Sequence, residues 1–571
     1  MSNDALTRVA LSFGQLRLWS LDQLQGPSAT YNIPQALRLR GTLNTVALAQ
    51  ALVLIIDRHE PLRTVIVANK NGTPRGLLLP PPDAATFVTH SDLQDLDPAL
   101  QEAALRQCIE EEVGKPFDLA KDYSLRARVI KLHALEHLLL LTLHHQASDG
   151  ESTSIFSREL SQAYSSLLQG QAPQWSALPI QYSDWAAWQQ KTLEATVDEQ
   201  IARAKTRLAQ APESLSLPLD HPRDANRARR AAYLPITLSS ELSQALSALA
   251  QRQGTTLFAL LLGAFGATLS RLANQATVVI GSPVAGRNHV ETEGLIGFLV
   301  NTLAIPITVE ANTNGLELIA QAKKSVEMAL IDQDLPFERL VDGLGVSRSL
   351  AQTPVFQAAF SFDVDNGESN SNTISLENLQ IEVITLTPDA VKNDLNLYLT
   401  KRQTHELDGV LVYDADLFDE ISVRAWCRAF EVLVHALAHH PDQTVLSLPL
   451  LDASEREQLI TQSAGPVVEL DPSLLTVPEL FAAQVAKTPD AIALVFEQER
   501  ITYQALDQAS NQLARYLIAQ GIGPEQIVAI LLDRSPQMII SMLAVLKAGG
   551  TYLPLDPDYP AQRLSFMLGD S

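Results

Sequence analysis

Hydrophobic residues recur along this chain with two different spacings. Short apolar runs typical of buried β-strands occur at 234–238, 276–283 and 303–309. Longer segments at 45–59 and 255–273 have the apolar spacing of helices that cover a hydrophobic core. Because strand-like and helical segments are interleaved, the pattern predicts a layered α/β fold.

Polar, irregular stretches interrupt this pattern. Three of them predict surface loops, at 80–98, 209–231 and 364–373. A further break at 450–473 precedes a new series of helical and strand-like segments, so we place the main domain boundary there. With 571 residues, of which 46% are hydrophobic, the chain is long enough for several folding units.

Charge and cysteine content narrow the classes of partner. The formal net charge of -23 opposes broad binding to nucleic acid or anionic membranes, since both are polyanions. Cys108 and Cys427 are the only cysteines, which excludes a disulfide framework and fits a reducing compartment. The chain does not open on a signal peptide, and no window approaches the ~18 continuous apolar residues of a membrane span. We therefore expect a cytoplasmic protein that binds neither nucleic acid nor membrane.

The segment 136–168 carries the candidate chemistry. Its apolar first part predicts a buried strand, and its second part predicts an amphipathic helix. His144, His145, Asp149 and Gly150 fall on the crossover between them, where side chains are fixed by the fold and still able to face a cleft. Neighbouring residues of a strand point to opposite sides, so we expect the two histidines to have different roles.

A histidine pair by itself does not establish function. A buried histidine is more often a hydrogen-bonded core residue than a catalytic one. Metal binding is disfavoured, because adjacent histidines on a strand do not easily ligate one ion and the helical spacing of a zinc protease is absent. We therefore expect no metal site.

The surrounding segments add a family resemblance. His144, His145, Asp149 and Gly150 match in full the HHxxxDG signature of the condensation domains of nonribosomal peptide synthetases. Six further regions are similar to the same family in the same order: SFGQLRLWSL (12–21) with YNIP (31–34), RHEPLRT (58–64), YSDWAAW (182–188), IGFLVNTL (296–303), DQDLPFERLV (332–341) and RSLAQTPVFQ (348–357). Seven matches in register make a chance resemblance untenable.

The resemblance implies a fold and its boundaries. It implies two lobes, each like chloramphenicol acetyltransferase, that meet in a V with the active site in a tunnel at the junction. We place the first lobe at 1–178, the second at 179–448 and a linker at 449–473. Residues 474–571 resemble the beginning of an amino-acid adenylation domain, without its phosphate-binding loop. That truncated α/β fragment is not expected to activate an amino acid.

The resemblance also implies a reaction, in which the α-amine of an acceptor attacks the thioester of a donor. His145 is then the catalytic histidine, either as a general base or as a group that steadies the developing ammonium. Asp149 is expected to be structural and to form an ion pair with Arg63. His144 is expected to be a buried orienting residue, and Gly150 to permit a tight backbone turn beside the substrate.

Three polar residues are candidates for the tunnel wall, namely Asn301, Gln333 and Glu151. For Asn301 and Gln333, a role as loop hydrogen-bonding residues is an equal alternative. Glu151 stands where the family commonly has an aromatic residue, which makes it a candidate for substrate selectivity. A second departure from the family pattern is Gly14, in place of the usual alanine, and we expect it to lie away from the chemistry.

The expected partners follow from the reaction. Both substrates would be carried as thioesters on the phosphopantetheine of carrier proteins, with no cofactor bound by this chain, which we expect to be monomeric. The first matched segment begins at residue 12, so the donor is expected in trans, from a peptidyl carrier or, in a starter domain, as a fatty acyl group on coenzyme A or an acyl carrier. Two alternatives remain open, namely a non-catalytic module that docks carriers or a tailoring enzyme, and acyl transfer to a small free amine or alcohol.

Overall fold

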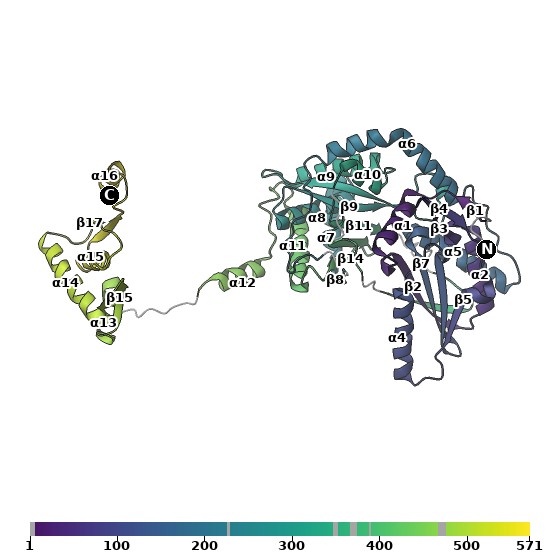
Figure 1. The fold of residues 1–571 in the computed structure, drawn as a ribbon, viewed down its shortest axis with the longest axis horizontal. Helices are drawn as coiled ribbons and strands as arrows, with labels where there is room; N and C mark the ends of the chain where they lie inside the picture. Colours follow the sequence, from purple (N-terminus) through teal and green to yellow (C-terminus); the bar gives the residue numbers. More distant parts are fainter. Residues whose placement is uncertain (1–5, 225–228, 347–351, 366–373, 387–389, 466–475) are drawn as a thin grey trace. The chain divides into compact units, whose positions relative to one another are not determined.

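A computed structural model describes residues 6–224, 229–346, 352–365, 374–386, 390–465 and 476–571. Parts of four segments singled out in the sequence lie outside the described residues, namely 209–231, 348–357, 364–373 and 449–473. The chain divides into two compact units, Met1–Arg456 and Glu457–Ser571. Each unit is considered by itself (Figure 1).

The first half of unit 1 is built on a mixed sheet with the strand order β12-β2-β7-β6-β5. Its neighbours are antiparallel, except for the parallel pair β5 and β6. The strands are β2 (Asn32–Gly41), β5 (Val88–Asp92), β6 (Leu125–His133), β7 (Glu136–His144) and β12 (Leu379–Ile384). A small antiparallel sheet lies beside it, formed by β1 (Thr7–Val9), β4 (Pro74–Leu78) and β3 (Thr64–Ala68).

The side chains of the central strand β7 form part of the hydrophobic core on both faces of this sheet. Its leucine run is buried on both faces, because successive side chains point to opposite sides of the sheet. One set packs with the helices α2 (Thr45–Arg58) and α5 (Gly150–Leu168), and the other lies on the side of α4 (Pro98–Gly114). The remaining helical segments of this half are α1 (Phe13–Gln25), η2 (Ala29–Tyr31), η3 (Glu60–Arg63), α3 (Ala84–Phe87), η4 (His145–Ala147) and α6 (Tyr182–Arg207).

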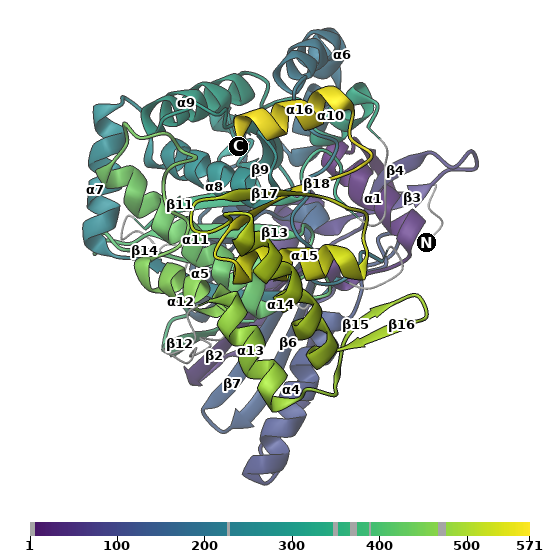
Figure 2. The ribbon, with the colours of Figure 1, turned by 90° about the vertical axis from the view of Figure 1, so that its left-hand side faces the viewer.

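The second half has a six-stranded mixed sheet in the order β10-β9-β11-β13-β14-β8. The strands are β8 (Ala231–Leu238), β9 (Thr277–Val284), β10 (Asn301–Thr308), β11 (Ala358–Val364), β13 (Leu395–Lys401) and β14 (Leu407–Asp414). The apolar helix α8 (Leu257–Ala273) is buried along most of its length, where it contacts β9 and β10 of the sheet and the helices α9 and α11 (Figure 2). The other helical segments are α7 (Ser240–Arg252), η5 (Val290–Thr292), α9 (Gly315–Ile331), α10 (Phe337–Leu344) and α11 (Glu420–His439).

The predicted two-lobed α/β architecture is therefore confirmed, but the division at 178/179 does not separate the two sheets. Strand β12 belongs to the predicted second lobe and pairs antiparallel with β2 of the first, from Leu379 opposite Gly41 to Ile384 opposite Ala36. Residues Ile374 and Leu376, which precede it, are buried in the core of the first sheet. The first lobe is thus completed by a segment more than two hundred residues further along the chain.

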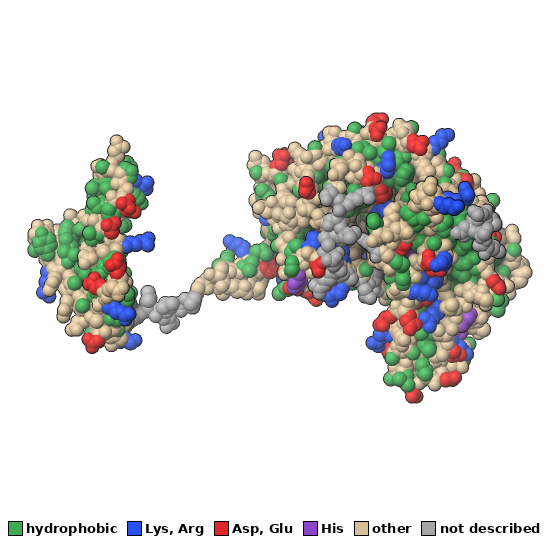
Figure 3. All heavy atoms as spheres, viewed as in Figure 1, with side chains coloured by type: hydrophobic (Ala, Val, Ile, Leu, Met, Phe, Trp, Pro, Cys, Tyr) green, Lys and Arg blue, Asp and Glu red, His purple; other side chains and the backbone are tan. Residues whose placement is uncertain are grey.

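Unit 2 is a small α/β fragment. It contains the antiparallel pair β15 (Ile492–Phe496) and β16 (Glu499–Thr502), and the parallel pair β17 (Ile527–Leu531) and β18 (Thr551–Leu555). Its helices are α13 (Val477–Lys487), α14 (Tyr503–Ala519), α15 (Pro536–Lys547) and α16 (Ala561–Asp570), while α12 (Ala453–Ser463) spans the division between the units. The Lys547 ammonium, 2.7 Å from Asp507 Oδ1, holds α15 to α14. Large apolar side chains remain exposed on this unit, among them Val495, Ile527, Leu531 and Phe566 (Figure 3).

Among the described residues, none of the helices alone has the length and apolar character to cross a membrane. The helices α7 and α8 have the required length and apolar character only when taken together, and the pair is bent by 106°.

Candidate functional site

The two histidines of the signature lie at the end of β7, where the strand passes into η4. His144 is 5% exposed, and its Nδ1 accepts a hydrogen bond from the backbone N–H of Gln146 at 3.2 Å. Its ring contacts the rings of Phe117 and Tyr31 edge-on. Burial, and then the positive charges of Lys392 and Arg126, lower the pKa of His144 to about 3. The predicted burial of His144 is confirmed, and its orienting role stays a prediction.

His145 is half-buried, and one nitrogen of its imidazole is fixed by the backbone. Its Nδ1 lies 2.8 Å from the carbonyl oxygen of Ser148. A carbonyl only accepts, so Nδ1 carries the proton and Nε2 of the neutral ring keeps its lone pair. Burial, and then the positive charge of Lys392, lower the pKa of His145 to about 3. At neutral pH the ring is therefore an uncharged hydrogen-bond acceptor.

Asp149 is the N-cap of α5 and is saturated with hydrogen-bond donors. Its Oδ1 accepts from the backbone N–H of Ser152 at 2.9 Å and from the Ser152 hydroxyl at 2.7 Å. Its Oδ2 accepts from the backbone N–H groups of Leu299 and Val300, at 3.0 and 3.2 Å. The guanidinium of Arg287 spans both oxygens, with two contacts of 2.9 Å. With six donors from both halves of unit 1, this carboxylate joins the halves and has no free lone pair directed at a substrate.

The predicted ion pair between Asp149 and Arg63 is therefore wrong, because Arg287 occupies that position. Arg63 instead donates to the carbonyl of Leu79 at 3.0 Å and approaches Asp57 at 3.8 Å. The segment RHEPLRT meets α5 through its first two residues: Arg58 and His59 lie 3.1 and 2.8 Å from the carboxylate of Glu159. Sequence order gave no sign of this exchange, since Arg287 and Asp149 are 138 positions apart.

At Gly150 the structure shows no backbone conformation that requires glycine, and its predicted role beside the substrate stays a prediction. Gly150 is the first residue of α5, its φ lies outside the left-handed region, and a Cβ added there would meet nothing within 4 Å. An alanine would therefore fit without strain. Its neighbour Glu151 is exposed in the first turn of α5, where a negative charge is favourable to the helix dipole; its effect on selectivity stays a prediction.

For Asn301 the structure favours the loop alternative over the tunnel wall. Its Nδ2 donates to the carbonyls of Gln333 and Leu335, at 2.8 and 2.7 Å. Its Oδ1 accepts from the N–H groups of Thr302 and Phe337. The side chain thus ties the start of β10 to the segment before α10. Gln333 is half-buried and contributes its backbone carbonyl to this contact.

Sequence reasoning missed two side chains near the histidines, Phe298 and Lys392. The ring of Phe298 lies edge-on to His145 with 4.7 Å between ring centroids. The Tyr182 hydroxyl donates to the carbonyl of Phe298 at 2.8 Å. The Lys392 ammonium lies 4.9 Å from the centroid of the Tyr31 ring. Phe298 and Tyr182 fall inside matched segments, whereas nothing in the sequence marks Lys392 as a neighbour of the histidines.

Lys392 reaches water but is surrounded by protein on most sides. Burial, and then the positive charge of Arg17, lower its pKa to about 8. Below that pH the ammonium disfavours a second positive charge on either histidine, which supports the neutral state of both rings.

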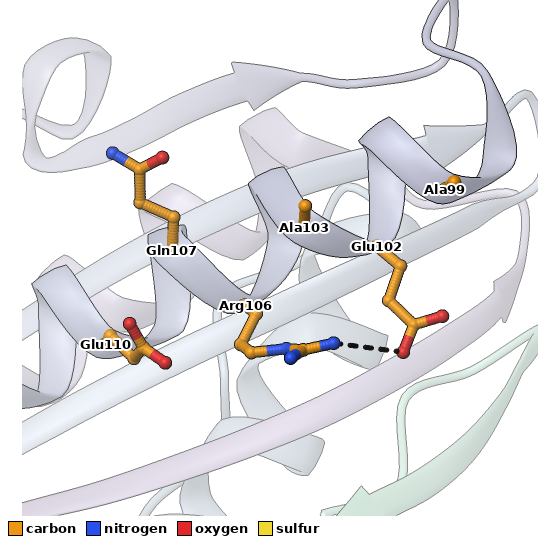
Figure 4. Close-up of a pocket in the computed structure, with 6 residues that line it drawn as sticks. All are labelled: Ala99, Glu102, Ala103, Arg106, Gln107 and Glu110. Atoms are coloured by element: carbon orange, nitrogen blue, oxygen red, sulfur yellow. Dashed lines mark ion pairs between the residues drawn. The ribbon is translucent and has the colours of Figure 1, made fainter.

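In the part of the chain that the structure describes, no group of three or more His, Cys, Asp or Glu side chains could hold a metal ion. A shallow surface pocket is lined by one face of α4, with Arg106 and Glu102 paired at 3.6 Å (Figure 4). Because one exposed helix supplies all of its lining residues, that pocket adds nothing to the site.

Fold and site together place the protein among two-lobed α/β proteins whose histidine motif lies where the lobes meet. Residues 6–460 match the family described as Condensation domain, and residues 481–571 match that described as AMP-binding enzyme. The first match spans most of the chain, and the chain therefore belongs to the condensation-domain family, followed by the N-terminal part of an AMP-binding domain.

Curated relatives are nonribosomal peptide synthetases. The chain is 39% identical to malpinin synthetase of Mortierella alpina, over 98% of this chain and 7% of that protein. It is 34% identical to a dimodular nonribosomal peptide synthase of Bacillus subtilis, over 99% and 24%. It is 37% identical to phosphinothricin tripeptide synthetase PhsC of Streptomyces viridochromogenes, over 98% and 51%. The chain thus spans between less than a tenth and about half of these relatives.

Solved structures agree with the fold. The X-domain from teicoplanin biosynthesis is 26% identical, with a TM-score of 0.71 over 79% of this chain and 100% of that chain. The same domain has been solved in complex with OxyB. A four-domain nonribosomal peptide synthetase bound to AMP and glycine superposes with a TM-score of 0.79 over 99% of this chain and 43% of that chain, at 24% identity.

Proposed function

We propose that unit 1 catalyses amide-bond formation between a donor acyl or peptidyl thioester and the α-amine of an acceptor aminoacyl thioester. The acceptor nitrogen forms a bond to the thioester carbon, the carbon–sulfur bond breaks, and the proton lost by nitrogen reaches the departing sulfur. The products are an amide and a thiol. The observation that carries this proposal is the neutral imidazole of His145, whose Nδ1–H is fixed on Ser148 and whose Nε2 is free to accept.

Within this proposal His145 acts chiefly by accepting a hydrogen bond from the attacking amine. A ring whose pKa is lowered to about 3 is neutral when the amine arrives, but it is a weak base and passes on a proton readily. Holding the amine near attack distance supplies much of the rate enhancement, because a thioester is already activated. Asp149 contributes by holding the segment around Leu299 and Val300 against α5.

The partners belong to the same proposal. Relatives that are peptide synthetases support carrier proteins bearing phosphopantetheine thioesters as the source of both substrates. The donor is a peptidyl group or, for a starter domain, a fatty acyl group. A reducing, cytoplasmic setting is also proposed, and it is supported by the free thiols of Cys108 and Cys427.

A second candidate is docking without catalysis. It is favoured by the similarity to the X-domain, a domain solved in complex with OxyB. The intact signature, with both histidines in place, favours catalysis over this alternative.

The deciding experiment is mass spectrometry of a purified carrier protein loaded with an aminoacyl acceptor, mixed with the full chain and a panel of carrier-bound donors. His145→Ala is the test variant, and His133→Ala, which replaces an exposed histidine at the end of β6, is the matched control. We expect amide on the acceptor carrier with the wild type and the control, and none with His145→Ala. Carrier binding without product for any donor would favour docking, and turnover of a free amine without a carrier would favour a simple acyltransferase.

A further inference from the structure

An aromatic ring from the second half of unit 1 packs against the imidazole of His145, and its place depends on a glycine. Phe298 lies edge-on to His145, with 4.7 Å between centroids and 65° between the ring planes. On another side of the same ring is Gly14, in α1. A Cβ at Gly14 would lie 2.6 Å from Cδ1 and 2.7 Å from Cε1 of Phe298, closer than non-bonded carbons approach. The ring therefore occupies space that any larger residue at position 14 would take.

The backbone of Phe298 is held on both sides, so the ring has little freedom to withdraw. Its carbonyl accepts from the buried hydroxyl of Tyr182 at 2.8 Å. The next two N–H groups, of Leu299 and Val300, donate to Asp149. On the other side a Cβ at Gly297 would lie 2.2 Å from the Tyr182 ring, which shows how closely the segment is packed there.

The hydrogen bond from Nδ1 to the carbonyl of Ser148 holds one edge of the imidazole, so the ring can still rotate about that contact. An edge-on aromatic neighbour at this centroid distance is in the favourable range and restricts that rotation. We propose that Phe298 is a positioning residue that sets the plane of the His145 imidazole, and that in this chain Gly14, which stands where the family usually has alanine, leaves the space that the Phe298 ring occupies. This inference rests on the proposed function for its activity readout only.

The expectation that Gly14 lies away from the chemistry is thereby corrected. Gly14 touches neither histidine, but it is one contact removed from His145 through Phe298. The inference also gives Asp149 a second consequence, since the carboxylate anchors the backbone that carries the positioning ring.

Gly14→Ala tests the inference directly. Because the backbone of Phe298 is held, the added methyl group should push the ring towards His145 and turn the imidazole. We expect a fall of roughly 10- to 100-fold in kcat, the scale of a displacement of about 1 Å at a reacting group. The KM for the carrier substrates should not change. Phe298→Leu removes the ring itself and should lower kcat by a similar factor. In the Phe298→Leu background, Gly14→Ala should add no further loss, because the ring atoms that it would crowd are gone.

The matched control is Gly114→Ala, at the end of α4, where an added Cβ meets nothing within 4 Å. A second readout does not depend on turnover: the rate at which diethyl pyrocarbonate modifies His145 in the full chain, followed by peptide mass spectrometry. The modification rate of Gly14→Ala and of Phe298→Leu should differ from that of the wild type, whereas Gly114→Ala should match the wild type and the double variant should match Phe298→Leu. Thermal unfolding of each variant verifies that it is folded.

The inference is overturned if folded Gly14→Ala or folded Phe298→Leu matches the wild type in both readouts, or if Gly14→Ala causes a further loss in the Phe298→Leu background. If the wild type forms no amide with any carrier pair, the proposed function fails, while the modification rates still decide whether Gly14 and Phe298 set the imidazole.

Discussion

The link between Asp149 and Arg287 makes a quantitative prediction about stability. Replacing Arg287 by methionine removes two of the six donors to Asp149 and leaves a carboxylate whose side chain is 2% exposed without its counter-charge. Removing one partner of a buried ion pair typically costs about 3–5 kcal/mol. For a unit of this size, that corresponds to a fall of roughly 3–5 °C in the unfolding temperature of unit 1.

Arg63→Met is the matched control, since Arg63 was the partner predicted from the sequence. Its contacts are a hydrogen bond to the carbonyl of Leu79, a longer one of 3.4 Å to the carbonyl of Asp57, and a distant approach to the Asp57 carboxylate. A hydrogen bond from a charged group contributes about 1.5–3 kcal/mol, so the control should lose less stability than Arg287→Met.

Scanning calorimetry of the full chain gives the unfolding temperatures, and Asp149→Asn completes a double-mutant cycle. Because the two side chains are in direct contact, the loss in the double variant should be smaller than the sum by about 1–3 kcal/mol. Additive losses, or an Arg63→Met variant as unstable as Arg287→Met, would refute the assignment of Arg287 as the partner of Asp149.

Three further predictions concern the site. Since the pKa of His145 is lowered to about 3, the rate of amide formation should not fall as the pH drops through the ordinary histidine pKa of about 6.5. Lys392→Met removes a neighbouring positive charge, so the pH at which the rate falls should rise. Lys392→Arg keeps the charge and should leave that pH low. Gly150→Ala should keep wild-type stability and helix content by circular dichroism, because the added Cβ meets open space; a large loss would show that the backbone at position 150 needs glycine. Asn301→Ala leaves four backbone groups without their side-chain partner, so it should lower the unfolding temperature measured by calorimetry. The amide assay should show that activity per folded molecule is largely kept.

Local sequence patterns correctly predicted the strand and the helix on either side of the histidine motif. The leucine run before His144 predicted the buried strand, and the amphipathic pattern after Asp149 predicted the helix that β7 enters. These elements are encoded by near neighbours in the sequence, through side-chain periodicity. Alternation along the strand predicted different roles for the two histidines, and the family resemblance implied that His144 is the buried one.

Long-range pairing could not be predicted in this way. The bidentate contact of Arg287 with Asp149 depends on how the two halves pack, and an arginine in a loop has no periodicity that reveals its partner. The position of Gly150 likewise suggested a special backbone, whereas the structure shows an ordinary helix start. The contact between Gly14 and Phe298 joins two segments that were each recognised, but not as neighbours.

Strand β12 also bears on how such domains are cut and recombined. A fragment ending near residue 178 would leave the hydrogen-bonding edge of β2 uncovered and would lack Ile374 and Leu376 from its core. An uncovered edge strand invites pairing with other chains, so that fragment should aggregate when made alone. During synthesis the first sheet cannot be completed until residue 384 has been added. The nascent first half therefore needs protection until most of unit 1 has emerged. A chimera that exchanges lobes should therefore take 374–384 from the same parent as β2.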